Sequence, residues 1–181
     1  IAEVIQSFAK HAPAGTRLIV KQHPHDNGWE NWSHLVRHLA QAWGINDRVD
    51  FIDGGDLGAL LKRAKGCVMI NSTVGLFSIR HGCPTKILGV AIYDMPGLTH
   101  QGSLDEFWAS PEPVDASLAT DLVRALAATI QVKGDFYKRA GRKVAVEAIV
   151  SRVLENRVNE PGAFIDPPPR VASIKRSTSL P

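Results

Sequence analysis

The chain has 181 residues, of which 44% are hydrophobic and 22% are charged. This globular composition excludes a disordered, collagen-like or fibrous protein. Lysine and arginine exceed aspartate and glutamate by 21 to 18, a mild excess that suits an anionic small ligand or a negatively charged membrane surface but is too small and dispersed to indicate nucleic acid.

The sequence predicts helices and short strands in alternation. Helices are expected over 1–11, 30–43, 57–64, 115–132 and 135–157, and a short one is expected from Ser72 or Thr73, either of which caps it, to Gly82. Strands are expected at 17–21, 49–52, 67–70 and 85–88, with an edge piece at 91–93, and residues 94–114 are expected to form a long loop because they are rich in Pro and Gly. The alternation predicts an α/β fold with a doubly wound parallel sheet.

The two ends of the chain differ from this pattern. The first residues are read as the middle of a helix with no initiating Met, so we expect the chain to be a piece of a larger protein. Residues 1–159 are predicted to form one domain, and the Pro-rich residues 160–181 are predicted to be a disordered tail or a surface strap. No signal peptide opens the chain and no apolar run reaches the ~18–20 residues that cross a bilayer.

One candidate site follows the apolar strand at 67–70, where the chain reads Asn71-Ser72-Thr73-Val74-Gly75. The amides at the start of the next helix and the two hydroxyls favour an anion, and Gly75 would let a phosphate approach the backbone. The alternative is that Ser72 only caps the helix and Gly75 is a packing glycine. The sequence leaves these interpretations at about even weight.

The second candidate site follows the strand at 17–21 and reads Lys21-Gln22-His23-Pro24-His25. The ring N–H of His23 can donate to a phosphoryl oxygen, Pro24 fixes the backbone, and Lys21 adds positive charge. The alternative is an ordinary surface turn. Because ligands bind at the carboxyl ends of parallel strands, we expect both segments to end strands of one sheet and to converge on one crevice.

Other motifs are weaker. His34 and His38 have the spacing of a metal-binding pair, but no Glu follows the first His, so a solvated helix face is favoured, and no metal site is predicted. Walker, GxGxxG and Gly-x-Ser-x-Gly motifs are missing from the sequence. Cys67 and Cys83 are interpreted as packed thiols in a reducing compartment.

Lys21-Gln22-His23-Pro24, with Asn71-Ser72-Thr73-Val74-Gly75-Leu76 about fifty residues later, resembles the bacterial capsule polysaccharide synthesis and export family. The segments 82–89 and 93–99 strengthen this resemblance, which covers roughly residues 15–110. Members of the family look like GT-B glycosyltransferases that transfer Kdo, an eight-carbon acidic sugar, from CMP-Kdo to a lipid-linked primer for capsule chains. The resemblance therefore implies a Rossmann-like domain, the C-terminal nucleotide-binding half of a GT-B enzyme whose N-terminal domain is missing from this chain.

The resemblance also implies roles for individual residues. His23 and Pro24 would hold the CMP phosphate, with His23 as the catalytic residue. Ser72 and Thr73 would bind the phosphate or ribose, and Asn71 would orient their loop. No cofactor is expected beyond the CMP-sugar substrate, since a single phosphate does not require a metal and the sequence has no Asp-x-Asp motif. The group that activates the lipid-linked acceptor or attacks the sugar is expected in the missing domain.

We expect a cytoplasmic location or peripheral attachment to the inner membrane, through contact with anionic lipid or with capsule export proteins. Two alternatives stay open. One is a GT-B transferase or epimerase that uses a UDP-sugar. The other is a non-catalytic interaction module of the export machinery.

Overall fold

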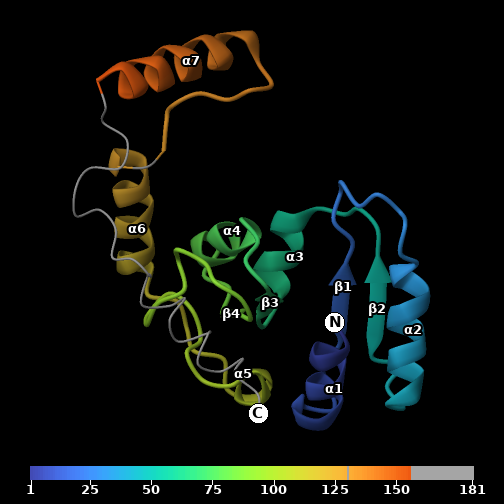
Figure 1. Cartoon of the computed structure of the whole chain (residues 1–181). Helices are drawn as coiled ribbons and strands as arrows, with labels where there is room; N and C mark the ends of the chain where they lie inside the picture. Colours follow the sequence, from blue (N-terminus) through green and yellow to red (C-terminus); the bar gives the residue numbers. More distant parts are fainter. Residues whose placement is uncertain (130, 156–181) are drawn as a thin grey trace, which may run out of the picture. The chain divides into compact units, whose positions relative to one another are not determined.

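The computed structural model describes residues 1–129 and 131–155 (Figure 1). The chain divides into two compact units, the first formed by residues 1–119 and the second beginning at Thr120. Among the described helices, none is long and apolar enough to cross a bilayer. The predicted boundary between a domain and a tail lies at residues 159 and 160, outside the described residues, and stays a prediction.

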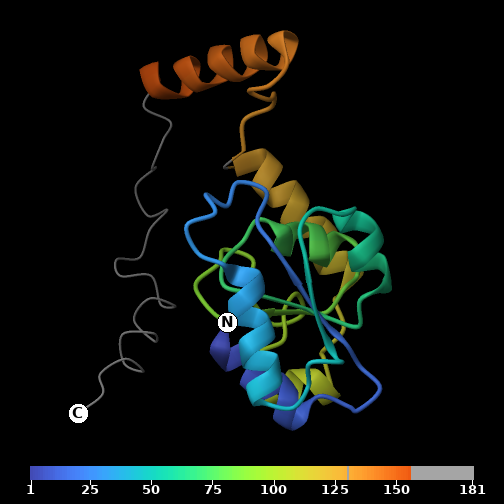
Figure 2. The same cartoon turned by 90° about the vertical axis from the view of Figure 1, so that its right-hand side faces the viewer.

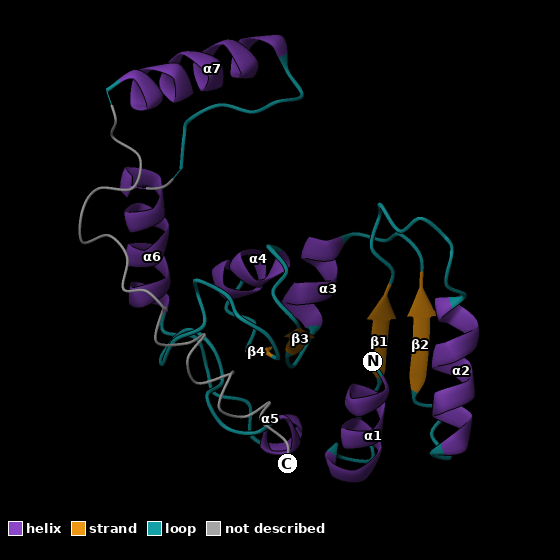
Figure 3. Cartoon of the chain, viewed as in Figure 1, coloured by secondary structure: helices purple, strands orange, loops and turns teal. Residues whose placement is uncertain are grey.

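Helices and short strands alternate along the first unit, as the sequence predicts (Figure 3). The elements are α1 (Ala2–His11), β1 (Leu18–Lys21), α2 (Trp32–Ala42), β2 (Val49–Ile52), α3 (Leu57–Arg63), β3 (Cys67–Met69), α4 (Val74–Arg80), β4 (Thr85–Ile87) and α5 (Leu104–Ala109). The helix α6 (Ala116–Thr129) begins in this unit, and the second unit also contains α7 (Arg139–Leu154).

The described strands are parallel, but they form two separate pairs rather than one sheet. β1 pairs with β2 in the register Leu18 to Val49, and β3 pairs with β4 in the register Cys67 to Thr85. The expectation that both candidate segments end strands of one sheet is therefore wrong, because each segment follows a different pair. Strands of three or four residues expose few backbone groups at an unpaired edge, and sequence patterns do not specify which strands share a ladder.

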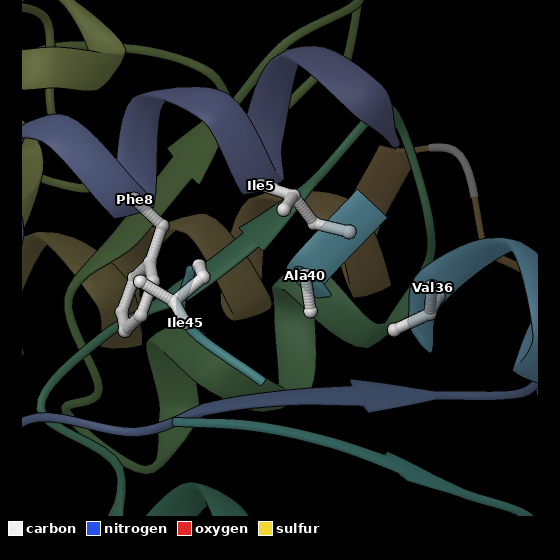
Figure 4. Close-up of a cluster of buried hydrophobic side chains, with 5 residues drawn as sticks. All are labelled: Ile5, Phe8, Val36, Ala40 and Ile45. Atoms are coloured by element: carbon white, nitrogen blue, oxygen red, sulfur yellow. The ribbon is translucent and has the colours of Figure 1, made fainter. Parts of the chain in front are cut away.

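A hydrophobic core holds α1 and α2 against one face of the first pair. Its buried side chains are Ile5, Phe8, Val36, Ala40 and Ile45 (Figure 4). Alternate strand residues pack on this core, namely Leu18, Val20, Val49 and Phe51, while Ile19 between them is exposed. The two helices lie beside the strand pair in both views of the chain (Figures 1 and 2).

The helix α5 lies inside the segment that we expected to be a loop. Ser103 caps it: its side chain accepts a hydrogen bond from the Glu106 amide, and Glu106 accepts one from the Ser103 amide in return. The amide and the hydroxyl of Ser103 both donate to the Glu106 carboxylate, at 2.7 and 2.9 Å, and they lower the pKa of that carboxyl. The Ser-x-x-Glu spacing of this capping box is visible in the sequence, but the loop was predicted from the surrounding glycines and prolines alone.

The expected edge strand at 91–93 is also wrong, because the amide of Asp94 donates to the carbonyl of Ala91 at 3.1 Å and closes a turn. Ala91 and Tyr93 are buried while Ile92 is exposed. Tyr93 instead points its side chain back toward the segment between β3 and α4, where its hydroxyl donates to the carbonyl of Ser72.

Helix α5 carries two adjacent aromatic residues that contact different parts of the unit. Trp108 packs edge-on against Phe8 of α1 with ring centroids 5.2 Å apart. Phe107 lies over Gly66, just before β3, where an added Cβ would come within 2.5 Å of the ring. The helix therefore connects the core of the first strand pair to the start of the second.

A buried serine orients this connection. The indole N–H of Trp108 donates to Ser7 Oγ at 2.8 Å, and Ser7 Oγ donates to Asp105 Oδ1 at 2.5 Å. Replacing Ser7 with Ala leaves the Trp108 N–H without its acceptor, so we expect a loss of ~1–3 kcal/mol in the free energy of unfolding. Urea denaturation measures this, with Ser110→Ala at an exposed position as the control. Equal stability of the two variants would contradict the role assigned to Ser7.

Candidate functional site

The segment after β1 is a hydrogen-bonded turn that displays His23. The carbonyl of His23 accepts from the amide of Asp26 at 3.0 Å, and the Asp26 carboxylate accepts from Trp32 Nε1 at 3.0 Å and from the amide of Gly28 at 2.9 Å. Trp32 belongs to α2, so the loop is tied to a helix. The sequence alone did not predict this role of Asp26 and Trp32.

A hydrogen bond to His23 determines the tautomer of its neutral ring. The amide of His25 donates to Nδ1 of His23 at 3.1 Å. An imidazole nitrogen that accepts a hydrogen bond carries no proton, so the neutral ring keeps its proton on Nε2. Because the side chain is exposed, Nε2–H is available as a donor to a ligand.

The substrate-binding roles expected for Lys21 and Pro24 stay predictions, and the structure shows the contacts of these residues. Lys21 is half-buried at the end of β1, and its Nζ lies 3.4 Å from the carbonyl of Gln22, so its charge is turned toward the chain's own backbone. Pro24 is exposed and forms part of the turn. The rings of His23 and His25 lie 5.7 Å apart.

The segment after β3 forms a compact turn. Ser72 Oγ accepts from the amide of Val74 at 3.2 Å, and the carbonyl of Ser72 accepts from the amide of Gly75 at 2.9 Å. The side chain of Thr73 makes no capping bond, so of the two predicted caps only Ser72 accepts a hydrogen bond from this turn. Asn71 and Thr73 are exposed beside it.

The side chain of Tyr93 packs against this turn. Its hydroxyl donates to the carbonyl of Ser72, and its ring fills the space where a side chain at Gly75 would lie. Burial, with a smaller contribution from the nearby Asp94 carboxylate, raises the pKa of the Tyr93 hydroxyl and keeps it a donor. Gly75 is buried under this ring, which favours the packing interpretation of this glycine, while the phosphate interpretation stays a prediction.

No hydrogen bond, ion pair or ring contact within 1–129 and 131–155 joins the residues around His23 to those around Ser72. The structure brings together the members of each segment, and the common crevice stays a prediction. A groove of about 350 Å³ lies elsewhere, between α2 and β2, and residues such as Arg37, Asp50 and Phe51 line it.

A buried histidine, His100, lies after β4 with polar partners that the sequence alone did not predict. His100 is 5% exposed, and its Nε2 lies 3.2 Å from the carbonyl of Ser103. Its Nδ1 lies 3.5 Å from the carboxylate of Glu112, while Lys86 Nζ approaches the carbonyls of His100 and Gly102. These contacts hold the segment between β4 and α5, whose residues lie too far apart in the sequence for a spacing argument to find them.

Within the part of the chain that the structure describes, no group of three or more His, Cys, Asp or Glu residues could hold a metal ion. His34 and His38 are exposed on α2 with their rings 6.5 Å apart, as expected for a solvated helix face.

The chain is similar to known capsule polysaccharide proteins, and a model of the capsule polysaccharide biosynthesis protein family matches residues 1–137. The capsule polysaccharide modification proteins LipB of Neisseria meningitidis serogroups A and B are each 38% identical over 140 residues. The capsule polysaccharide export protein KpsS of Escherichia coli is 35% identical over 137 residues. These alignments cover 76–77% of this chain but 33–35% of the relatives, so the chain spans about a third of their length. No solved structure matches.

The contact between Gly75 and Tyr93 yields a stability prediction. In Gly75→Ala the new methyl group collides with the Tyr93 ring, and overpacking of this kind costs ~1–3 kcal/mol. Gly15→Ala is the matched control, because nothing lies within 4 Å of the position of its Cβ. Thermal unfolding should show a lower midpoint for Gly75→Ala alone, and an unchanged midpoint would mean that the ring does not occupy this space.

The cysteines yield a prediction about reactivity. Both are free, and burial, reinforced by Cys83 and opposed by a hydrogen bond from Ser78, raises the pKa of Cys67 from 9.0 to about 11. Only the thiolate reacts, so Cys67 should alkylate ~100-fold more slowly in the native chain than in urea at neutral pH, and faster as pH rises toward 11. Mass spectrometry after iodoacetamide treatment follows this, and equal native and unfolded rates would contradict the prediction.

Proposed function

The chain belongs to the capsule polysaccharide biosynthesis family, and on this premise we propose that it is the donor-binding part of a glycosyltransferase that transfers Kdo from CMP-Kdo. The observation that carries the proposal is the fixed ring of His23, whose Nδ1 is occupied by the His25 amide and whose Nε2–H faces solvent. The finer identity of donor and sugar rests on the resemblance of the His23 and Ser72 motifs to members that use CMP-Kdo.

The proposed chemistry concerns the charge that appears on CMP. When the bond between the sugar and the phosphate breaks, negative charge develops on the departing phosphate oxygens. A donor that is already oriented, such as Nε2–H of His23, stabilises this charge without reorganisation, and one such donor contributes ~2.7–4 kcal/mol in other enzymes. The lipid-linked acceptor and the group that activates it would be bound by the remaining part of the protein.

The turn at residues 71–73 would supply the second half of the pocket. The amides of Ser72 and Thr73 have no acceptor among the described residues, and the exposed hydroxyl of Thr73 is unengaged there. These groups can donate to a phosphate or a ribose hydroxyl. Tyr93 would hold the turn in place by its bond to the Ser72 carbonyl.

We expect CMP to raise the thermal midpoint of the chain and UMP to raise it less. Free ligand at about 100 times its dissociation constant stabilises the folded state by ~2.7 kcal/mol. His23→Ala should remove most of the CMP effect and leave the midpoint without ligand nearly unchanged, because the ring is exposed. His34→Ala, at an exposed histidine of α2, is the matched control and should keep the full CMP effect.

Each contrary result has a distinct meaning. A larger effect of UMP than of CMP would favour a UDP-sugar enzyme, and no effect of either nucleotide would favour a non-catalytic module of the export machinery. Equal binding of CMP by wild type and His23→Ala would contradict the role of His23.

A further inference from the structure

The positive charge of the chain is concentrated after the part that the family model matches. Residues 1–130 contain eleven Lys or Arg and thirteen Asp or Glu, a net charge of −2. Residues 131–155 contain six Lys or Arg and three Asp or Glu, a net charge of +3. This short segment consists of α7 and the connection that precedes it, so α7 lies in a basic part of a chain whose first 130 residues carry a small net negative charge.

One face of α7 is already occupied by the connection. An added Cβ at Gly134 would lie 2.9 Å from the side chain of Ala145, and Ala145 is buried. Arg152 donates to the carbonyl of Gln131 at 3.1 Å, and Gly141 contacts Asp135. Gly141, Ala145 and Arg152 are spaced by four and seven residues, so they share one face of the helix.

The opposite face carries what we call the outer stripe, a row of residues at intervals of three or four positions. Its first turn is cationic and its remainder is apolar. In order, its members are Arg139, Arg142, Lys143, Val146, Ile149, Val150 and Val153, and all are exposed. The acidic residue beside it is Glu147, 3.9 Å from Lys143. Phe136 and Tyr137, just before the helix, are also exposed.

We propose that the outer stripe of α7 binds the surface of an anionic lipid membrane. Arg139, Arg142 and Lys143 would contact phosphate headgroups, and the valines and isoleucine that follow would enter the boundary between headgroups and acyl chains. Aromatic residues such as Phe136 and Tyr137 favour this interfacial zone. The cationic part of the stripe complements the negatively charged headgroups, and its apolar part complements the beginning of the acyl chains.

The charges of the outer stripe disfavour a second copy of the helix as its binding partner. A parallel pair would place the three cations of each stripe against one another, and an antiparallel pair would bury them against valines. A nucleic acid would leave the apolar half of the stripe without a partner. An anionic lipid surface offers a partner to both the cationic and the apolar residues of the stripe.

The test is sedimentation of the full chain with vesicles. We expect the chain to sediment with vesicles of phosphatidylcholine and phosphatidylglycerol, to stay in solution with phosphatidylcholine alone, and to be released by salt. Replacing Arg139, Arg142 and Lys143 together with Gln should lower the partition coefficient on the order of 100-fold. The control replaces Lys62, Arg63 and Lys65 with Gln, which removes the same charge from an exposed segment of the first unit and should change binding little.

Two substitutions at equally exposed valines test the apolar part of the stripe. Val150 is 48% exposed on the stripe, and Val144 is 47% exposed outside it. Val150→Glu should lose vesicle binding and Val144→Glu should keep it, with circular dichroism recording helix content. The proposal is overturned if wild type does not bind the anionic vesicles, if both Gln triples bind equally, or if the two Glu variants bind equally. Nucleotide binding plays no part in these measurements, so they are independent of the proposed function.

Discussion

Two neighbouring aromatic side chains of α5 hold the first unit together, Trp108 against Phe8 and Phe107 over Gly66. Within the described residues, no ladder of backbone hydrogen bonds links β1 to β3, so the two strand pairs depend on side-chain contacts for their relation. Trp108 reaches the core of the first pair and Phe107 the start of the second. Ser7 and Asp105 fix the orientation of Trp108 through two hydrogen bonds.

This dependence has a consequence for function. The segment with His23 follows the first strand pair, and the segment with Ser72 follows the second. A pocket that uses both segments therefore requires the contacts of α5 as well as the residues that touch the ligand. The second support is Tyr93, which holds the Ser72 turn because Gly75 leaves room for its ring. In the proposed pocket, side chains that do not touch the ligand would therefore set the geometry of the residues that do.

Helical periodicity and short β-branched runs predicted most elements of the first unit, because these signals are local. The capping box at Ser103 is equally local, and with it α5 could have been predicted despite the Gly and Pro residues around it. The turn at Ala91–Asp94 could not, because Tyr93 is buried by a contact with a segment about twenty residues earlier rather than by a strand partner. Strand pairing failed for the same reason, since it depends on long-range packing.

The candidate site shows the same division between local and distant signals. The donor character of His23 follows from neighbours two residues away, and its place at a strand end was predicted. The packing role of Gly75, the tie between Asp26 and Trp32, and the buried His100 depend on partners that sequence spacing does not reveal. The family resemblance added the nucleotide and the sugar, which no feature of the fold specifies.

The central claim is that His23 and the Ser72 turn contact the same nucleotide. Titration of the isotopically labelled chain with CMP, followed by amide NMR, tests it most directly. The account predicts that amides of residues 22–26 and of residues 71–75 shift together, with one common dissociation constant. Shifts confined to one segment, or two segments that titrate with different constants, would contradict a shared pocket.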